Sequence, residues 1–127
     1  MQGGNDPDNR RGMEWQRATP ANPTLRFYKR LIAARNRSRA LQSGAPAILL
    51  TDDAAQTLAY SRTLGQEVAI VALNRSAKPQ TLNIPLPPHT PTHWTDALTD
   101  KPLDANSPTS MQVQLAPLSS AILIPRA

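Results

Sequence analysis

The chain has 127 residues, a formal net charge of +5, 39% hydrophobic residues and no cysteine. This length allows one domain of ordinary size, and the absence of cysteine excludes disulfide frameworks and thiolate zinc sites. No apolar run reaches the ~20 residues that a membrane-spanning helix needs, and the N-terminal sequence lacks the pattern of a signal peptide. We therefore expect a soluble protein, with the cytoplasm favoured.

Residues 1–22 are polar, and acids, arginines, glycines and prolines are mixed there before any hydrophobic periodicity begins. Such a composition predicts a loop. Asp6 and Arg10 lie four residues apart in this loop, a spacing at which the two side chains can form a salt bridge. We expect Arg11 and Trp15 to be structural, because a tryptophan at the end of a loop usually packs and finds a partner for its N–H.

The spacing of apolar residues predicts a helix over residues 23–42. Asn22 is suited to cap it, Pro23 suits its first turn, and Gly44 marks its end. Two apolar rows follow the helical period: Leu25, Tyr28 and Ile32 in one, and Phe27, Leu31 and Ala34 in the other. A stripe this wide must bury against something. Because the rest of the chain is small, we expect part of the stripe to remain uncovered.

From Ala47 onward, the apolar pattern changes to that of short β-strands separated by turn-forming clusters. Met111, Val113 and Leu115 alternate with glutamines, which indicates one inward and one outward face. Several short strands with frequent turns predict an antiparallel sandwich. The expected strands are 48–50, 57–62, 68–73, 81–84, 111–115 and 121–124. The side chains expected to point inward are Val68, Ile70, Ala72, Val113, Leu115, Ile122 and Ile124. The third and the last of these strands are apolar enough to be buried on both faces.

Five segments match a known pattern in order along the chain: 3–11 with Met13 and Trp15, 27–35, 68–76, 94–99 and 118–125. Together they resemble glycoside hydrolases of the α-amylase superfamily (family 13). The likeness is greatest to the neopullulanase, cyclomaltodextrinase and maltogenic amylase group. The first segment is similar to the loop after the eighth barrel strand, and the second to the last barrel helix. The other three resemble parts of the C-terminal β-sandwich.

The resemblance implies a mainly β fold. A C-terminal antiparallel (Greek-key) β-sandwich would be preceded by a loop and one amphipathic helix of a (β/α)8 barrel. Residues 1–44 would then be the end of the catalytic barrel, and residues 45–127 the sandwich domain. Asp100 stands where the family commonly has a glycine after Thr99, and aspartate tolerates the left-handed conformation of such a turn better than most residues.

The resemblance also implies that the catalytic residues lie elsewhere. In this family they occur on earlier barrel strands, and retaining hydrolysis needs two carboxylates that face each other. Here Asp6 and Asp8 share one loop, and Asp52 and Asp53 lie in an expected turn. We therefore assign no catalytic residue and expect the chain alone to be inactive.

The function that the resemblance implies is that of a C-terminal fragment of an α-glucan-acting glycoside hydrolase. The fragment would support the barrel and supply a sugar-contacting loop. Asp6 and Arg10 match the family's pair that binds sugar hydroxyls, since a carboxylate and a guanidinium offer complementary acceptors and donors. The expected partners are an α-glucan oligosaccharide and the missing catalytic barrel. No cofactor is expected.

Two other functions are compatible with the sequence. One is a stand-alone, non-catalytic carbohydrate-binding β-sandwich. Separately, Trp94 could form an exposed stacking platform for sugars, but packing in a core is favoured, because tryptophan is mostly buried. The other function is that of a basic nucleic-acid-binding protein. Nine of the fourteen basic residues fall between Arg10 and Arg39, and no acid occurs between Glu14 and Asp52. No nucleic-acid motif accompanies these charges, so nucleic acid is an unlikely partner.

His89 and His93 are four residues apart, which is a metal-ligand spacing on a helix. Pro87, Pro88 and Pro91 are incompatible with a helix there. No cysteine or nearby acid completes a ligand set, so no metal site is expected.

Overall fold

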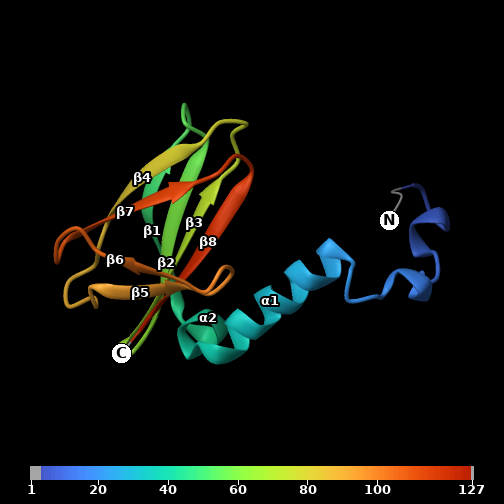
Figure 1. Cartoon of the computed structure of the whole chain (residues 1–127), viewed down its shortest axis with the longest axis horizontal. Helices are drawn as coiled ribbons and strands as arrows, with labels where there is room; N and C mark the ends of the chain where they lie inside the picture. Colours follow the sequence, from blue (N-terminus) through green and yellow to red (C-terminus); the bar gives the residue numbers. More distant parts are fainter. Residues whose placement is uncertain (1–3, 127) are drawn as a thin grey trace.

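The computed structural model describes residues 4–126 (Figure 1). Two 3₁₀ helices, η1 Asp8–Arg10 and η2 Trp15–Arg17, precede the α-helices α1 Pro23–Arg37 and α2 Arg39–Ser43. The strands are β1 Ala45–Asp52, β2 Thr57–Leu64, β3 Glu67–Asn74, β4 Gln80–Pro85, β5 His93–Asp96, β6 Lys101–Asp104, β7 Ser110–Leu115 and β8 Ser119–Pro125. Figure 1 shows α1 extending from the sandwich toward the N-terminal loop. Within the described residues, neither α-helix combines the length and apolar character needed to cross a bilayer.

Helix α1 begins where the sequence predicts. The Asn22 side-chain oxygen accepts hydrogen bonds from Thr24 N at 3.0 Å and Leu25 N at 3.2 Å, so two free amide donors of the first turn are satisfied. The expectation of one helix over 23–42 is wrong, because the backbone becomes extended at Ser38 (φ −127°, ψ 115°). The Ser38 hydroxyl accepts from Leu41 N at 3.3 Å and caps a second helix.

The strands form two antiparallel sheets. The larger has the order β1-β2-β3-β8-β5-β6, and the smaller consists of β4 and β7. β8 lies between β3 and β5, which is the kind of non-sequential pairing that Greek-key connections produce. The six predicted strands are confirmed. Two further strands, β5 and β6, are not among the six expected ones. β6 gives no strand signal, because Pro102 and the flanking charges mask its single half-buried apolar residue, Leu103.

The main core lies between the two sheets. Its largest fully buried side chains are Trp94, Ile70, Leu82, Ile84, Met111 and Leu123. The inward predictions for β3 and β7 are confirmed, but those for Ile122 and Ile124 are wrong. Ala121 and Leu123 face this core instead. β8 is apolar on both faces, so hydrophobicity alone does not reveal which residues point inward.

The opposite face of the six-stranded sheet is called the outer face. Ala40 and Leu41 of α2 pack there against Ala69 and Val71 of β3. Four further residues contribute to the same cluster and are only half-buried: Tyr60, Leu73, Ile122 and Ile124. α2 therefore covers one part of the outer face and leaves the rest open.

Two polar side chains fix the turns: Asn74 is buried, and Asp96 is half-buried. Asn74 donates to the carbonyls of Lys78 and Ala116, both at 2.8 Å, and thereby joins two turns. The Asp96 carboxylate accepts from Leu98 N and Ile122 N, both at 3.1 Å. Asn74 and Asp96 lie in segments 68–76 and 94–99, two of the segments that carry the family resemblance. Their hydrogen bonds show that both segments stabilise turns.

The turn after Asp96 also bears out a prediction about its backbone. Asp100 adopts a left-handed conformation, with φ of 59°. The Asp100 amide donates to the Asp96 carbonyl at 2.8 Å, which closes the turn. An aspartate therefore occupies a conformation that glycine commonly supplies.

Candidate functional site

Asp6 and Arg10, the candidate sugar-binding residues, face each other in the N-terminal loop. The amide of Arg10 donates to the carbonyl of Pro7 at 3.0 Å, which closes the η1 turn. Arg10 Nε lies 2.6 Å from Asp6 Oδ1, and Arg10 Nη2 donates to Asp6 Oδ2 at 2.8 Å. Both side chains are largely exposed. The structure thus contains the loop salt bridge, in a bidentate form, and leaves further acceptor and donor capacity open to solvent.

The prediction that Trp15 packs against the chain is wrong. Its side chain is 74% exposed, and it lies in the short helix η2. The neighbouring Glu14 and Arg17 form an exposed salt bridge at 2.8 Å across the same turn. The indole is therefore a large, exposed apolar group in the same loop as Asp6 and Arg10. Trp15 belongs to neither core cluster.

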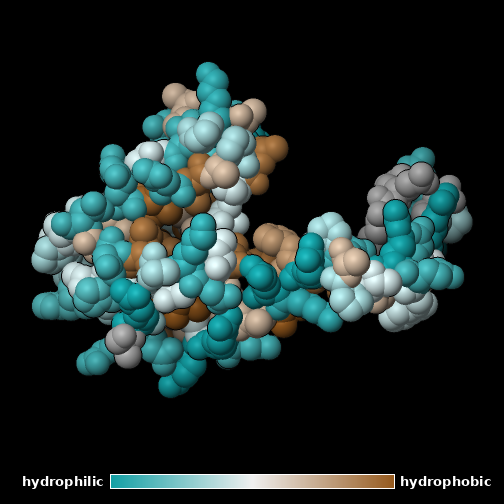
Figure 2. Space-filling view, in the orientation of Figure 1, coloured by the Kyte–Doolittle hydropathy of each residue, from teal (hydrophilic) through white to brown (hydrophobic). Residues whose placement is uncertain are grey.

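The apolar stripe of α1 is partly uncovered, as predicted. Tyr28 and Ile32 are both 58% exposed, and Phe27 is 46% exposed. Ala34 is the buried residue of the helix. The rings of Phe27 and Tyr28 meet edge to face, with centroids 6.3 Å apart. In Figure 2, apolar surface is visible on α1 between the sandwich and the N-terminal loop.

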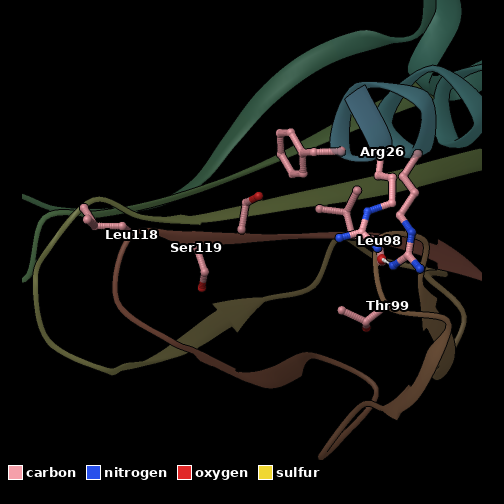
Figure 3. Close-up of a pocket in the computed structure, with 8 residues that line it drawn as sticks. Arg26, Leu98, Thr99, Leu118 and Ser119 are labelled. Atoms are coloured by element: carbon pink, nitrogen blue, oxygen red, sulfur yellow. Dashed lines mark hydrogen bonds between the residues drawn. The ribbon is translucent and has the colours of Figure 1, made fainter. Parts of the chain in front are cut away.

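Two adjoining hollows separate α1 from the sandwich. The first encloses about 540 Å³ and the second about 350 Å³, and they share Phe27 and Ser120. We call the combined depression the α1 groove. Figure 3 shows the first hollow, with Arg26 of α1 and Leu98 near one end and Leu118 and Ser119 toward the other.

The second hollow lies over the outer face of the sheet. Its lining combines Phe27, Leu31 and Arg35 of α1 and Leu41 of α2 with side chains of the sandwich: Tyr60, Arg62, Val71, Leu73 and Ile122. Most of this lining is apolar, and the polar exceptions are the two arginines and Ser120.

Several basic residues of the helical region make structural contacts. The Arg30 guanidinium donates to the Leu98 carbonyl. Arg35 donates to the carbonyls of Leu41 at 2.5 Å and Gln42 at 2.9 Å. Carbonyls at a helix C-terminus lack intrahelical donors, so Arg35 stabilises the end of α2. These contacts hold α1 against the rest of the chain at one end, although its apolar rows remain open.

The two histidines do not come together in a metal site. His93 Nδ1 lies 2.9 Å from Asp104 Oδ1, and Arg126 donates to the same oxygen at 3.0 Å. The hydrogen bond with His93, followed by the positive charge of Arg126, lowers the pKa of Asp104 below its ordinary value of 3.8. His89 occupies a left-handed turn position. Within residues 4–126, no three histidines, cysteines or acids cluster as metal ligands.

Trp94 is completely buried in the main core. The expectation of a core tryptophan is confirmed. Trp94 therefore does not form an exposed stacking platform for sugars.

The chain is similar to a cyclomaltodextrinase, a neopullulanase and an α-amylase. Residues 47–122, more than half of the chain, match the family model described as Maltogenic Amylase, C-terminal domain. A cyclomaltodextrinase from Geobacillus thermopakistaniensis (strain MAS1) is 38% identical over 87 residues, which cover 68% of this chain and 14% of that protein. Neopullulanase 2 from Thermoactinomyces vulgaris is 30% identical over 123 residues, which cover 97% of this chain and 21% of that protein.

A solved structure shares the fold of the whole chain. It is the α-amylase from Geobacillus thermoleovorans complexed with acarbose, with a TM-score of 0.81 and 23% sequence identity. The similarity covers 100% of this chain and 27% of that one. The present chain thus spans a minor part of the length of each relative. Because the family model covers most of the sandwich, the chain belongs to the maltogenic amylase C-terminal domain family of the α-amylase-type glycoside hydrolases.

Proposed function

We propose that the chain acts as the C-terminal portion of an α-glucan-cleaving glycoside hydrolase, in which the sandwich supports a catalytic barrel. The observation that carries this proposal is the exposed apolar row of α1, where Tyr28 and Ile32 are each 58% exposed. Fully burying a side chain such as isoleucine contributes about 1.5–3 kcal/mol, so this row is a strong site for a packing partner.

The proposed division of the chain follows from the same helix. Residues 1–44 would belong to the barrel, and residues 45–127 would form the sandwich domain. The amide of Gly44 still donates to the Ala40 carbonyl at 2.8 Å, and β1 begins at the next residue. This proposal assigns α1 and the N-terminal loop to the barrel, which is why they bury so little against the sandwich.

In the intact enzyme, Asp6 and Arg10 would bind hydroxyl groups of an α-glucan oligosaccharide. Their bidentate contact orients the carboxylate and guanidinium together, and their exposure leaves lone pairs and N–H groups available. The complex of the Geobacillus thermoleovorans α-amylase with acarbose supports a sugar as the ligand class. The loop alone does not supply a facing pair of carboxylates, so the barrel would provide the catalytic acids.

A chimaera tests this function. The cyclomaltodextrinase of Geobacillus thermopakistaniensis would have its matching C-terminal segment replaced by this chain. We expect the chimaera to hydrolyse cyclodextrin and the isolated chain to release no reducing sugar from starch, pullulan or cyclodextrin. A chimaera that folds around its barrel but shows no activity, or an isolated chain with activity that disappears with Asp6→Asn, would contradict the proposal.

Variants of the chimaera then test the loop. Asp6→Asn and Arg10→Gln should each lower kcat/KM for cyclodextrin on the order of tenfold or more, since hydrogen bonds to charged groups are worth about 1.5–3 kcal/mol. Glu14→Gln is the matched control, because Glu14 is an exposed acid of the same loop that pairs with Arg17. Equal effects of Asp6→Asn and Glu14→Gln would remove the sugar-binding assignment.

A further inference from the structure

We propose that the α1 groove docks an apolar segment that carries carboxylates. The proposal rests on the proposed function in one respect, since it names the catalytic barrel as the source of that segment. It goes further by assigning the chemistry of the docking segment and the arginine that anchors it. Three observations carry it: an apolar floor on central strands, a set of arginines without acidic partners, and one buried guanidinium nitrogen that lacks an acceptor.

The floor of the groove is apolar and firmly held. Tyr60 of β2, Leu73 of β3 and Ile122 of β8 are half-buried there, beside the end of α2. Each of these strands is hydrogen-bonded to a neighbour on both sides. The floor is therefore a rigid surface, whereas the helix wall supplies Phe27 and Leu31 from the opposite side. Such a surface fits an apolar segment better than a small polar ligand.

The charged side chains of the groove are all positive. Arg26, Arg30, Arg35 and Arg62 all line it. In the part of the chain that the structure describes, the ion pairs involve other residues, and none includes these four arginines. Arg30 and Arg35 donate to backbone carbonyls, which do not neutralise their charge. Complementarity therefore requires a segment with carboxylates.

Arg62 gives the strongest indication of a missing acceptor. It lies on β2, two residues from Tyr60, so both side chains lie on the outer face. Its Nε atom is buried and has no hydrogen-bond partner within residues 4–126. A buried donor without an acceptor is unfavourable, and more so when the group is charged. A carboxylate in the groove would satisfy this nitrogen and could bind the guanidinium bidentately.

Two other occupants fit the same surface less well. A second copy of this chain would bring a net charge of +5 and the same arginines to the groove, so the two copies would repel each other. Single-stranded nucleic acid could pair phosphates with the arginines, but it binds by stacking bases on aromatic rings. The floor offers Tyr60 among aliphatic side chains. An acidic and apolar protein segment matches both the floor and the charges.

Synthetic peptides test the chemistry on the complete chain. Three fluorescein-labelled amphipathic peptides of equal length would be compared by fluorescence anisotropy: one of leucine and glutamate, one of leucine and lysine, and one of alanine and glutamate. We expect only the leucine–glutamate peptide to bind, with an affinity that falls as salt is raised. Equal binding of the leucine–lysine peptide would overturn the proposal. Tighter binding of an oligothymidylate than of any peptide would also overturn it and assign the groove to nucleic acid.

Arginine variants locate the anchor. Arg62→Gln should weaken binding of the leucine–glutamate peptide on the order of tenfold. Arg62→Lys keeps the charge but lacks the bidentate fork, so it should bind with intermediate affinity. Arg37→Gln is the control, because Arg37 ends α1, which forms one wall of the groove, but Arg37 itself does not line the groove. Melting curves would confirm that all variants fold, and methyl NMR should show shifts at Leu73 and Ile122. Unchanged affinity in both Arg62 variants would refute the assignment.

The chimaera separates this proposal from the proposed function. If the chimaera is active and Arg62→Gln leaves its melting temperature unchanged, the supporting function stands and the groove proposal is wrong. If the chimaera is inactive but the peptide binds through Arg62, the groove chemistry stands and the barrel is not its source. Activity together with a lower melting temperature in Arg62→Gln, but not in Arg37→Gln, would support both.

Discussion

The sandwich and the α1 region differ in how far their side chains are buried and hydrogen-bonded within the chain. The sandwich buries its large apolar residues between two sheets, and Asn74 and Asp96 satisfy backbone groups at its turns. In contrast, α1 leaves Tyr28 and Ile32 more than half exposed. One region therefore stabilises itself, whereas the other offers surface for contacts beyond it. Substitutions of matched residues in the two regions should make this difference measurable.

The largest effect is expected from a charge in the main core. Val113 is 3% exposed, so Val113→Asp would bury a carboxylate without a partner. We expect it to lower the free energy of unfolding by ~3 kcal/mol or more. Ile32→Asp on α1 is the matched control and should change stability by less than about 0.5 kcal/mol. Urea denaturation followed by circular dichroism measures both, and similar losses would erase the proposed difference between the regions.

A polar residue of the sandwich should come next. Asn74→Ala removes donors to the carbonyls of Lys78 and Ala116 and an acceptor for Ser76. Leaving such buried groups unsatisfied should cost about 2–3 kcal/mol. Asn83→Ala serves as the control, because Asn83 is exposed and accepts a single side-chain bond from Gln112. If the two variants unfold at the same urea concentration, Asn74 does not stabilise the turns as described.

The junction between the two regions should show a smaller effect. A Cβ atom added at Gly44 would lie 2.5 Å from the Ala40 carbonyl oxygen and 2.9 Å from Thr63 N. Both are backbone atoms, so Gly44→Ala should destabilise the chain by about 1–3 kcal/mol through overpacking. Gly12→Ala in the N-terminal loop meets nothing within 4 Å and should be close to neutral. The melting temperatures of the two variants are compared. An unchanged melting temperature in Gly44→Ala would mean that the backbone at the junction moves to accommodate the added Cβ atom.

The smallest effect concerns the exposed carboxylate of Asp104. Its pKa in the folded chain is lowered first by the hydrogen bond with His93 and then by Arg126. A lowered folded pKa contributes stability above the unfolded pKa, and this contribution is lost as the pH falls through the folded pKa. Wild type and Asp104→Asn should therefore differ slightly in melting temperature at about pH 6 and converge toward about pH 2. A difference that grows on acidification would contradict this sign.

The fold could be predicted where apolar residues recur at a clear period along the sequence. The alternation at Met111, Val113 and Leu115 defines both the strand and its inward face. In β8, the sequence does not reveal which residues point inward. Apolar residues lie on both faces, so shifting the strand by one residue leaves its hydrophobic pattern unchanged. The break at Ser38 was missed, since a serine is tolerated within a helix and also favoured as a cap. Tertiary contacts decide between these roles.

The candidate sites differ in the same way. Asp6 and Arg10 are close in sequence, so their spacing alone predicted a contact between them. The role proposed for Arg62 could not be predicted, because it depends on the direction of β2 and on α1, which is distant in sequence. A single arginine within a predicted strand does not indicate a binding role until the fold shows which side chains surround it. Trp15 was misjudged for a related reason, since packing propensity does not reveal whether a partner is present.

The central position of β8 affects how the domain forms during synthesis. β8 joins β3 on one side and β5 on the other, so it links the β1–β3 part of the sheet to the β5–β6 hairpin. β8 also follows the other seven described strands in the sequence, so it leaves the ribosome after them. Until then, the edges of β3 and β5 remain open to pairing with other chains, which is a common route to aggregation. Nascent chains that stop before residue 119 should therefore depend on chaperones for their solubility more strongly than the finished domain does.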